Sequence, residues 1–178
     1  MEILGSKGFY SCDDKDFLNK IDQLENDSSP PFNDVANQVL HRLSSELLLS
    51  TFSKKIPQLV ALGFWLRPAQ IKDLYLKSIS QTDNFNMPVS RGVAFHLPPQ
   101  NVDTLFVYSW SLSFLAGNIN IVRLPTEMTD VLKWLVDLIY NILNDFDIEH
   151  EQIFCRYKAE KDLTSLISEK SDLRMIWG

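Results

Sequence analysis

The stretch Gly92-Val-Ala-Phe-His-Leu97, followed at once by Pro98-Pro99, decides how the rest of the chain is interpreted. A short apolar run that ends at two prolines has the length and boundaries of a buried β-strand. Asn101 can then cap a helix, because its side chain can accept a hydrogen bond from the free N–H groups of the first turn. The predicted helix ends at Gly117-Asn118, which is a typical helix stop.

The same alternation of strand and helix continues after this segment. Further elements are predicted as a strand over 119–123, a helix that begins at Thr126, a strand over 152–157, a short helix over 162–168 and a strand over 173–177. Such alternation predicts parallel strands joined by right-handed crossovers. We therefore expect an α/β fold with a three-layer parallel sheet, in which ligands bind at the carboxyl ends of the strands.

The chain before this segment divides into two parts. Residues 1–33 are expected to be a flexible N-terminal segment, because the stretch 26–31 has turn and linker composition. Residues 34–90 are expected to be a helical region, and residues 91–178 a partial α/β domain. In the helical region, helices are expected to begin near Asn33 or Asp34, near Pro57 and near Ala69.

Composition and charge narrow the class of protein. The chain has 178 residues, of which 45% are hydrophobic and 22% charged, so a soluble globular protein is expected. Its net charge of −6 argues against nucleic acid as a partner, because an acidic surface repels phosphate backbones. No stretch reaches the roughly 20 apolar residues of a membrane span, and the N-terminus lacks a secretory signal pattern. We expect a cytoplasmic protein.

The cysteines and histidines argue against a disulfide framework and against a metal site. Cys12 and Cys155 are too few for such a framework, which suits a reducing compartment. His41, His96 and His150 lie far apart and have no nearby cysteine, whereas zinc ligands usually come in close pairs. No metal is therefore expected.

Three ordered motifs carry the functional hypothesis, since the usual glycine-rich dinucleotide and P-loop patterns are absent from the sequence. They are His96-Leu-Pro-Pro-Gln-Asn101, Leu115-Ala-Gly-Asn118 and Ile121-Val-Arg-Leu-Pro-Thr-Glu127. These motifs resemble the aldehyde dehydrogenase superfamily, in which a strand ends in Pro-x-Asn, a helix ends in Ala-Gly-Asn and the next strand ends in Lys-Pro-Ser-Glu.

One branch of that superfamily is more similar still. The stretches 59–67, 91–101, 105–110 and 168–178 resemble the long-chain acyl-CoA reductases, including the fatty-acid reductases of bacterial bioluminescence. The resemblance implies a Rossmann-like NAD(P)-binding domain of the aldehyde dehydrogenase type, incomplete in this chain and preceded by N-terminal helices. It also implies reduction of a fatty acyl thioester, such as an acyl-CoA, to an aldehyde with NADPH, or alternatively with NADH.

The resemblance assigns roles to two residues at the ends of neighbouring predicted strands. Asn101 would donate its amide to the oxygen that becomes negative in the reaction, which typically stabilises the transition state by ~3 kcal/mol. Its alternative role is that of a helix N-cap. Arg123 stands where the family usually has a lysine on the adenine ribose, and its planar fork suits a 2′-phosphate. Its alternative role is that of a solvent-facing arginine. We expect Asn101 and Arg123 to share one dinucleotide cleft.

Further cofactor-binding residues follow from the same resemblance. They are Leu97, Pro98, Pro99, Gln100, Thr126, Trp177 and Gly178. The prolines and Gln100 would line the nicotinamide end through backbone groups, although turn geometry also explains prolines there. The sequence departs from the family pattern at Leu124, where a proline is usual, and at Lys158-Ala-Glu160, where relatives have a glycine.

A catalytic cysteine is missing from the expected context. Cys155 lies inside an apolar strand and is expected to be a core residue, so this chain alone is expected to be inactive. The leading hypothesis is the N-terminal cofactor-binding portion of an NADPH-dependent acyl-CoA reductase. The alternative is a non-catalytic interaction module that keeps the fold. A last strand at the edge of the sheet predicts a homodimer or a partner chain.

Two further features each have two interpretations. His96 is a base or, as we favour, a structural histidine at a strand end. The aromatic side chains of the helix after Asn101 either border an acyl tunnel or, as we favour, pack in the core. They are Phe106, Tyr108, Trp110 and Phe114.

Overall fold

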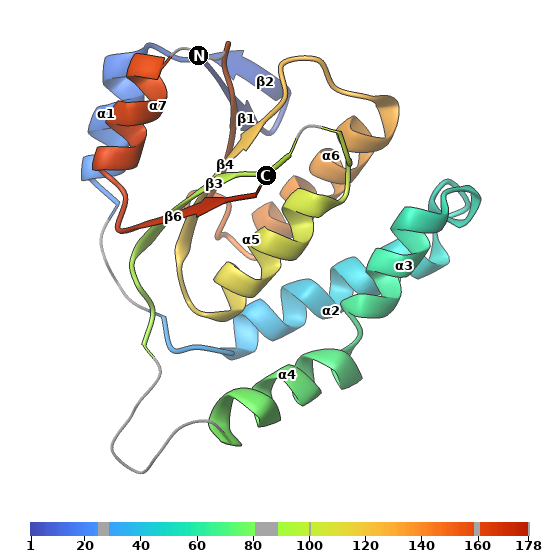
Figure 1. Cartoon of the computed structure of the whole chain (residues 1–178). Helices are drawn as coiled ribbons and strands as arrows, with labels where there is room; N and C mark the ends of the chain where they lie inside the picture. Colours follow the sequence, from blue (N-terminus) through green and yellow to red (C-terminus); the bar gives the residue numbers. More distant parts are fainter. Residues whose placement is uncertain (25–28, 81–88, 100, 159–160, 178) are drawn as a thin grey trace.

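The fold is an α/β arrangement, and the computed structural model describes residues 1–24, 29–80, 89–99, 101–158 and 161–177 (Figure 1). The strands are β1 (Glu2–Gly5), β2 (Gly8–Ser11), β3 (Val93–Leu97), β4 (Ile119–Leu124), β5 (Gln152–Arg156) and β6 (Leu173–Ile176). The helices are α1 (Asp14–Asp22), α2 (Asp34–Leu49), the short 3₁₀ helix η1 (Ser53–Lys55), α3 (Pro57–Trp65), α4 (Pro68–Ser80), α5 (Leu105–Leu115), α6 (Asp130–Asp145) and α7 (Lys161–Glu169).

The strands form one mixed sheet in the order β2-β1-β5-β4-β3-β6. β5, β4, β3 and β6 run parallel, with Phe95 opposite Ile121 and Ile121 opposite Ile153. This confirms the parallel strands that the alternation after residue 91 predicts. β1 and β2 run antiparallel and extend the sheet beyond β5. The sheet is therefore mixed, whereas we expected a wholly parallel sheet.

The N-terminal residues form regular elements, which corrects the expectation of a flexible segment over 1–33. Successive residues of a strand point to opposite faces, and both Ile3 and Leu4 are buried, one in each of the two cores. Glu2 lies opposite Arg156, whose guanidinium donates two hydrogen bonds to the carboxylate, at 2.6 and 3.2 Å. This bidentate pair and the buried Phe17 of α1 hold the hairpin on the sheet.

Two helices begin later than predicted. α5 begins after Thr104, which makes no capping hydrogen bond through its side chain, so Asn101 is not the N-cap of this helix. α6 begins directly after Thr129 and not at Thr126. Thr129 Oγ1 accepts a hydrogen bond from the N–H of Leu132 at 3.0 Å, and this cap fixes the start of the helix.

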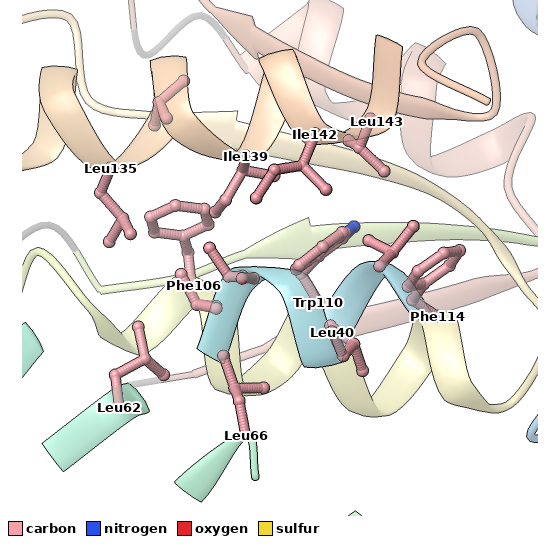
Figure 2. Packing of buried hydrophobic residues seen from close by; sticks show 14 of the residues in the cluster. Leu40, Leu62, Leu66, Phe106, Trp110, Phe114, Leu135, Ile139, Ile142 and Leu143 are labelled. Atoms are coloured by element: carbon pink, nitrogen blue, oxygen red, sulfur yellow. The ribbon is translucent and has the colours of Figure 1, made fainter. Parts of the chain in front are cut away.

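The helices lie in layers on the two faces of the sheet (Figure 1). α1 and α7 cover one face, and α5 and α6 cover the other, with α2, α3 and α4 outside them. Figure 2 shows leucines of α2 and α3 meeting the aromatic side chains of α5 and the apolar stripe of α6. Trp110 is fully buried there and stacks on Phe114 with ring centroids 5.4 Å apart. Each such buried side chain stabilises the fold by roughly 1.5–3 kcal/mol.

Candidate functional site

The carboxyl ends of β3, β4 and β6 form the edge at which the predicted site residues gather. Across the sheet, the parallel strands lie in the order β5-β4-β3-β6. Successive strands are therefore added in one direction from β3 to β5, and β6 is then added on the other side of β3, so the order reverses between β3 and β6. In open α/β sheets, ligands bind outside the carboxyl ends of the strands at such a reversal. Leu97 lies opposite Ile176 there, and the N–H of Trp177 donates to the Leu97 carbonyl at 3.2 Å. The structure therefore brings the predicted residues Leu97 and Trp177 together.

Asn101 is exposed at the edge of a cavity of about 310 Å³. Ile56 and Gln58 at the start of α3 and Thr129 before α6 also line this cavity. Thr129 Oγ1 donates to Asp103 Oδ2 at 2.7 Å, which joins the loop after β3 to the start of α6. The Asn101 side chain has no hydrogen-bond partner among the residues that the structure describes. Its amide is thus available to a ligand.

The other residues predicted around Asn101 have different surroundings. Pro98 and Pro99 line a recess of only about 10 Å³, which has room for at most one water molecule. Both prolines are half-buried. Thr126 is exposed in the turn between β4 and α6. Gln100 and Gly178 lie outside the described residues.

Arg123 is a half-buried cation whose hydrogen-bonding capacity is largely unused. Its guanidinium carbon lies 4.6 Å from the centroid of the Tyr157 ring, and Nη2 donates a long hydrogen bond of 3.5 Å to the Tyr157 carbonyl. Its Nε is buried without a partner, and no carboxylate of the described residues pairs with it. Burial raises the pKa of Tyr157 to about 12, against the opposing effects of a hydrogen bond from Thr164 and of the Arg123 charge.

Arg123 and Asn101 lie on different sides of the sheet, which corrects the expectation of one shared cleft. β3 and β4 are adjacent and parallel as expected. Because side chains alternate along a strand, Arg123 shares the face of Ile119 and Ile121, which α1 and α7 cover. The cavity at Asn101 lies on the other face, at the starts of α3 and α6. Only a ligand that passes over the tips of β3 and β4 can reach both residues.

His96 stands at the centre of a buried hydrogen-bond network on the α5 side of the sheet. Its Nδ1 lies 2.8 Å from Ser109 Oγ, and its Nε2 lies 2.8 Å from Asn120 Oδ1. The amide of Asn120 donates to the Asn118 carbonyl and to Gln152 Oε1. Asn120 Oδ1 must therefore accept from His96 Nε2–H, which leaves Nδ1 to accept from the Ser109 hydroxyl.

The network reaches the strand tips through Ser109. Ser109 Oγ accepts a hydrogen bond from the Trp177 indole N–H at 3.0 Å, so the residue after β6 is held against α5. Desolvation lowers the pKa of His96 to about 4, which keeps the ring neutral near pH 7. Both ring nitrogens are occupied and the side chain is fully buried. These contacts support the structural interpretation of His96 and leave no nitrogen free to act as a base.

Cys155 and the aromatic residues of α5 belong to the core. Burial raises the pKa of the Cys155 thiol to about 12, so this cysteine is not a nucleophile. Phe106, Trp110 and Phe114 are buried, which confirms the core interpretation for these three. Tyr108 is half-buried and meets the ring of Trp65 edge-on, with centroids 4.7 Å apart.

Three results concern the class of protein. Among the described residues, no three His, Cys, Asp or Glu side chains are grouped so that they could hold a metal ion. In the same part of the chain, no helix is both long and apolar enough to cross a membrane. Comparison with known proteins finds no family model and no curated protein that matches this chain.

Sequence reasoning missed two groups of residues, one around His96 and one at Arg123. Asn120 and Gln152 are polar residues inside apolar strands, a pattern that signals a buried partner, yet their link to His96 depends on strands that are distant in sequence. Tyr157 lies two residues beyond Cys155 and therefore on the same face, which places it beneath Arg123. The sequence shows this spacing, but it indicates a contact with Arg123 only when β4 and β5 are known to be neighbours.

The buried neutral His96 predicts a pH dependence of stability. Its pKa of about 4 in the folded state lies below the ordinary 6.5, so the unfolded chain binds a proton first as the pH falls. The contribution of His96 to the free energy of unfolding is fully present above about pH 6.5. It decreases as the pH falls from about 6.5 to about 4, by about 3 kcal/mol in total. Urea unfolding from pH 7 to pH 4 should show this extra loss relative to the variant His96→Gln.

The matched control is His41→Gln, which replaces an exposed histidine of α2. This variant should lose stability with falling pH in parallel with the unmodified protein. Identical pH profiles for the unmodified protein and for His96→Gln would contradict the buried neutral state.

Proposed function

We propose that the carboxyl edge of the parallel strands binds a nicotinamide dinucleotide, and that the chain is the N-terminal cofactor-binding portion of an NADPH-dependent acyl-CoA reductase. A Rossmann-like α/β domain of the aldehyde dehydrogenase type is part of this proposal. Two observations support the proposal. The strand order reverses between β3 and β6, and the predicted residue Leu97 lies at that edge of the sheet. Bound NADPH would supply the hydride that reduces the acyl carbon.

The unpaired guanidinium of Arg123 is the single observation that carries the proposal. A half-buried charge without a counter-charge is unfavourable, because burial removes water. Among the described residues, only the Tyr157 ring and one long hydrogen bond to the Tyr157 carbonyl replace that water, and Nε has no partner. A phosphate would supply the missing acceptors, and the planar fork of arginine matches its oxygens. Stacking on Tyr157 holds the fork in place before the ligand arrives. We therefore favour NADPH, whose ribose carries a 2′-phosphate, over NADH.

Asn101 has the second role in this proposal. Its free amide borders the cavity of about 310 Å³ on the opposite face, where an acyl thioester would lie. The amide would donate to the oxygen that becomes negative when the thioester is attacked. An extended dinucleotide would cross the tips of β3 and β4 and so connect the two faces.

The nucleophile for such a reaction is not provided by the described cysteines. Cys155 is buried in the sheet, and burial also raises the pKa of Cys12. The chain by itself is therefore expected to bind the cofactor without turnover. Free cysteines fit a cytoplasmic location, which is part of the same proposal.

A second candidate function, an interaction module, is favoured by the outer edge of β6. Within the described residues, this strand pairs with β3 on one side only and is the last strand of the sheet. Ile176 is 71% exposed and Trp177 is 42% exposed beside it. An uncovered strand edge with exposed apolar side chains favours pairing with another strand, from a second copy or from a partner chain.

The dinucleotide proposal predicts a difference between the two cofactors. By calorimetry, NADPH should bind at least tenfold more tightly than NADH, and Arg123→Ala should remove that difference, because a tenfold change corresponds to about 1.4 kcal/mol and charged hydrogen bonds contribute as much. Arg123→Lys should retain part of it. Arg42→Ala, at an exposed position of α2, is the matched control and should change neither affinity. Equal affinities, or an unchanged NADPH affinity in Arg123→Ala, would refute the assignment.

The edge of β6 predicts self-association that a charge can prevent. Sedimentation should show a dimer for the unmodified chain and a monomer for Ile176→Lys, because a lysine on an edge strand opposes strand pairing. Leu49→Lys is the matched control, since Leu49 of α2 is also 71% exposed, and it should remain a dimer. A monomer at every concentration of the unmodified chain would argue against a second copy, and equal effects of both lysines would argue against β6 as the contact.

A further inference from the structure

A second cavity, of about 440 Å³, lies beneath the β1–β2 hairpin. One wall comes from the hairpin and α1, and the other from the end of α6 and the residues that lead into β5. Because β5 begins there, this cavity lies at the amino end of the parallel strands, away from Asn101 and Arg123. Its volume is within the range of small-molecule sites.

The lining of the cavity carries more positive than negative charge, whereas the protein as a whole is negatively charged. Lys7 and Lys20 both line it, and the only carboxylate among its lining residues is that of Glu149. Neither lysine forms an ion pair or a hydrogen bond through its ammonium group within the described part of the chain. In a chain with a net charge of −6, two unpaired ammonium groups at one cavity make a local site for an anion.

Aromatic side chains form the other part of the lining. Tyr10 of β2 and Tyr140 of α6 both border the cavity. The Tyr10 ring lies close to Gly5, where a Cβ atom would come within 3.0 Å of it, so the glycine allows this placement. Burial, with a smaller effect of the Glu149 charge, raises the pKa of Tyr140, so its phenol is a neutral donor.

The geometry points to a binding site for a small anion that combines one phosphate group with one aromatic ring, of the size of a mononucleotide. In this complex the phosphate lies between Lys7 and Lys20, and the ring lies against Tyr10 and Tyr140. Stacking of a base on an aromatic side chain contributes about 1–3 kcal/mol, and the ammonium groups offset the phosphate charge. The site is separate from the proposed dinucleotide edge and does not depend on it.

Calorimetry with uridine 5′-monophosphate, uridine and inorganic phosphate tests the site on the full chain. The nucleotide should bind at least tenfold more tightly than either half, because uridine lacks the phosphate and phosphate lacks the ring. The double variant Lys7→Gln/Lys20→Gln should weaken nucleotide binding at least tenfold. Lys54→Gln/Lys55→Gln, an equal change of charge at two exposed positions of η1, is the matched control and should leave nucleotide binding unchanged.

Two further variants separate the ring from the phosphate and this cavity from the strand tips. Tyr10→Leu should weaken the nucleotide but not inorganic phosphate, and Arg123→Ala should change neither. The proposal is overturned if the nucleotide does not bind, if it binds no better than phosphate, or if both double lysine variants weaken it equally. Thermal unfolding of each variant checks that the substitution leaves the fold intact.

Discussion

The neutral His96 ring, buried between β3 and α5, is the constraint on which the strand tips depend. It uses one nitrogen as a donor and the other as an acceptor, so it joins the hydroxyl of Ser109 to the amide of Asn120. An unsatisfied polar group at such a depth costs about 1–3 kcal/mol, and a charged ring costs more. The network is therefore stable only when complete, and its last bond, from Trp177 to Ser109, fixes the residue that follows β6.

The two faces of the carboxyl edge differ in the residues that they present. On the α5 side, the polar groups around His96 are satisfied internally, and Asn101 lies beside a cavity that Asp103 also lines. On the α7 side, Arg123 has only the ring and carbonyl of Tyr157 as partners. A ligand with a phosphate at one end and an uncharged acceptor at the other fits this division. The hairpin cavity adds a second region of positive charge at the opposite end of the sheet.

The sequence predicted those features that depend on local pattern. Apolar runs ended by Pro98-Pro99 or Gly117-Asn118 located the parallel strands, because strand length and helix stops are written in neighbouring residues. The hairpin at the N-terminus was missed, since its two strands are short and their anchor pairs Glu2 with Arg156, 154 positions away. The site was predicted only in part: Leu97 and Trp177 do meet, but the pleat of β4 turns Arg123 away from Asn101, and that depends on where the strand ends.

Nitrogen NMR can establish whether the buried His96 ring is neutral, because the shifts of the two ring nitrogens report both the tautomer and the charge. We expect a neutral ring with the proton on Nε2 at pH 7, and no protonation until the pH approaches about 4. A ring that titrates near the ordinary value of 6.5, or one that carries its proton on Nδ1, would contradict the network and the position of the strand tips that it supports.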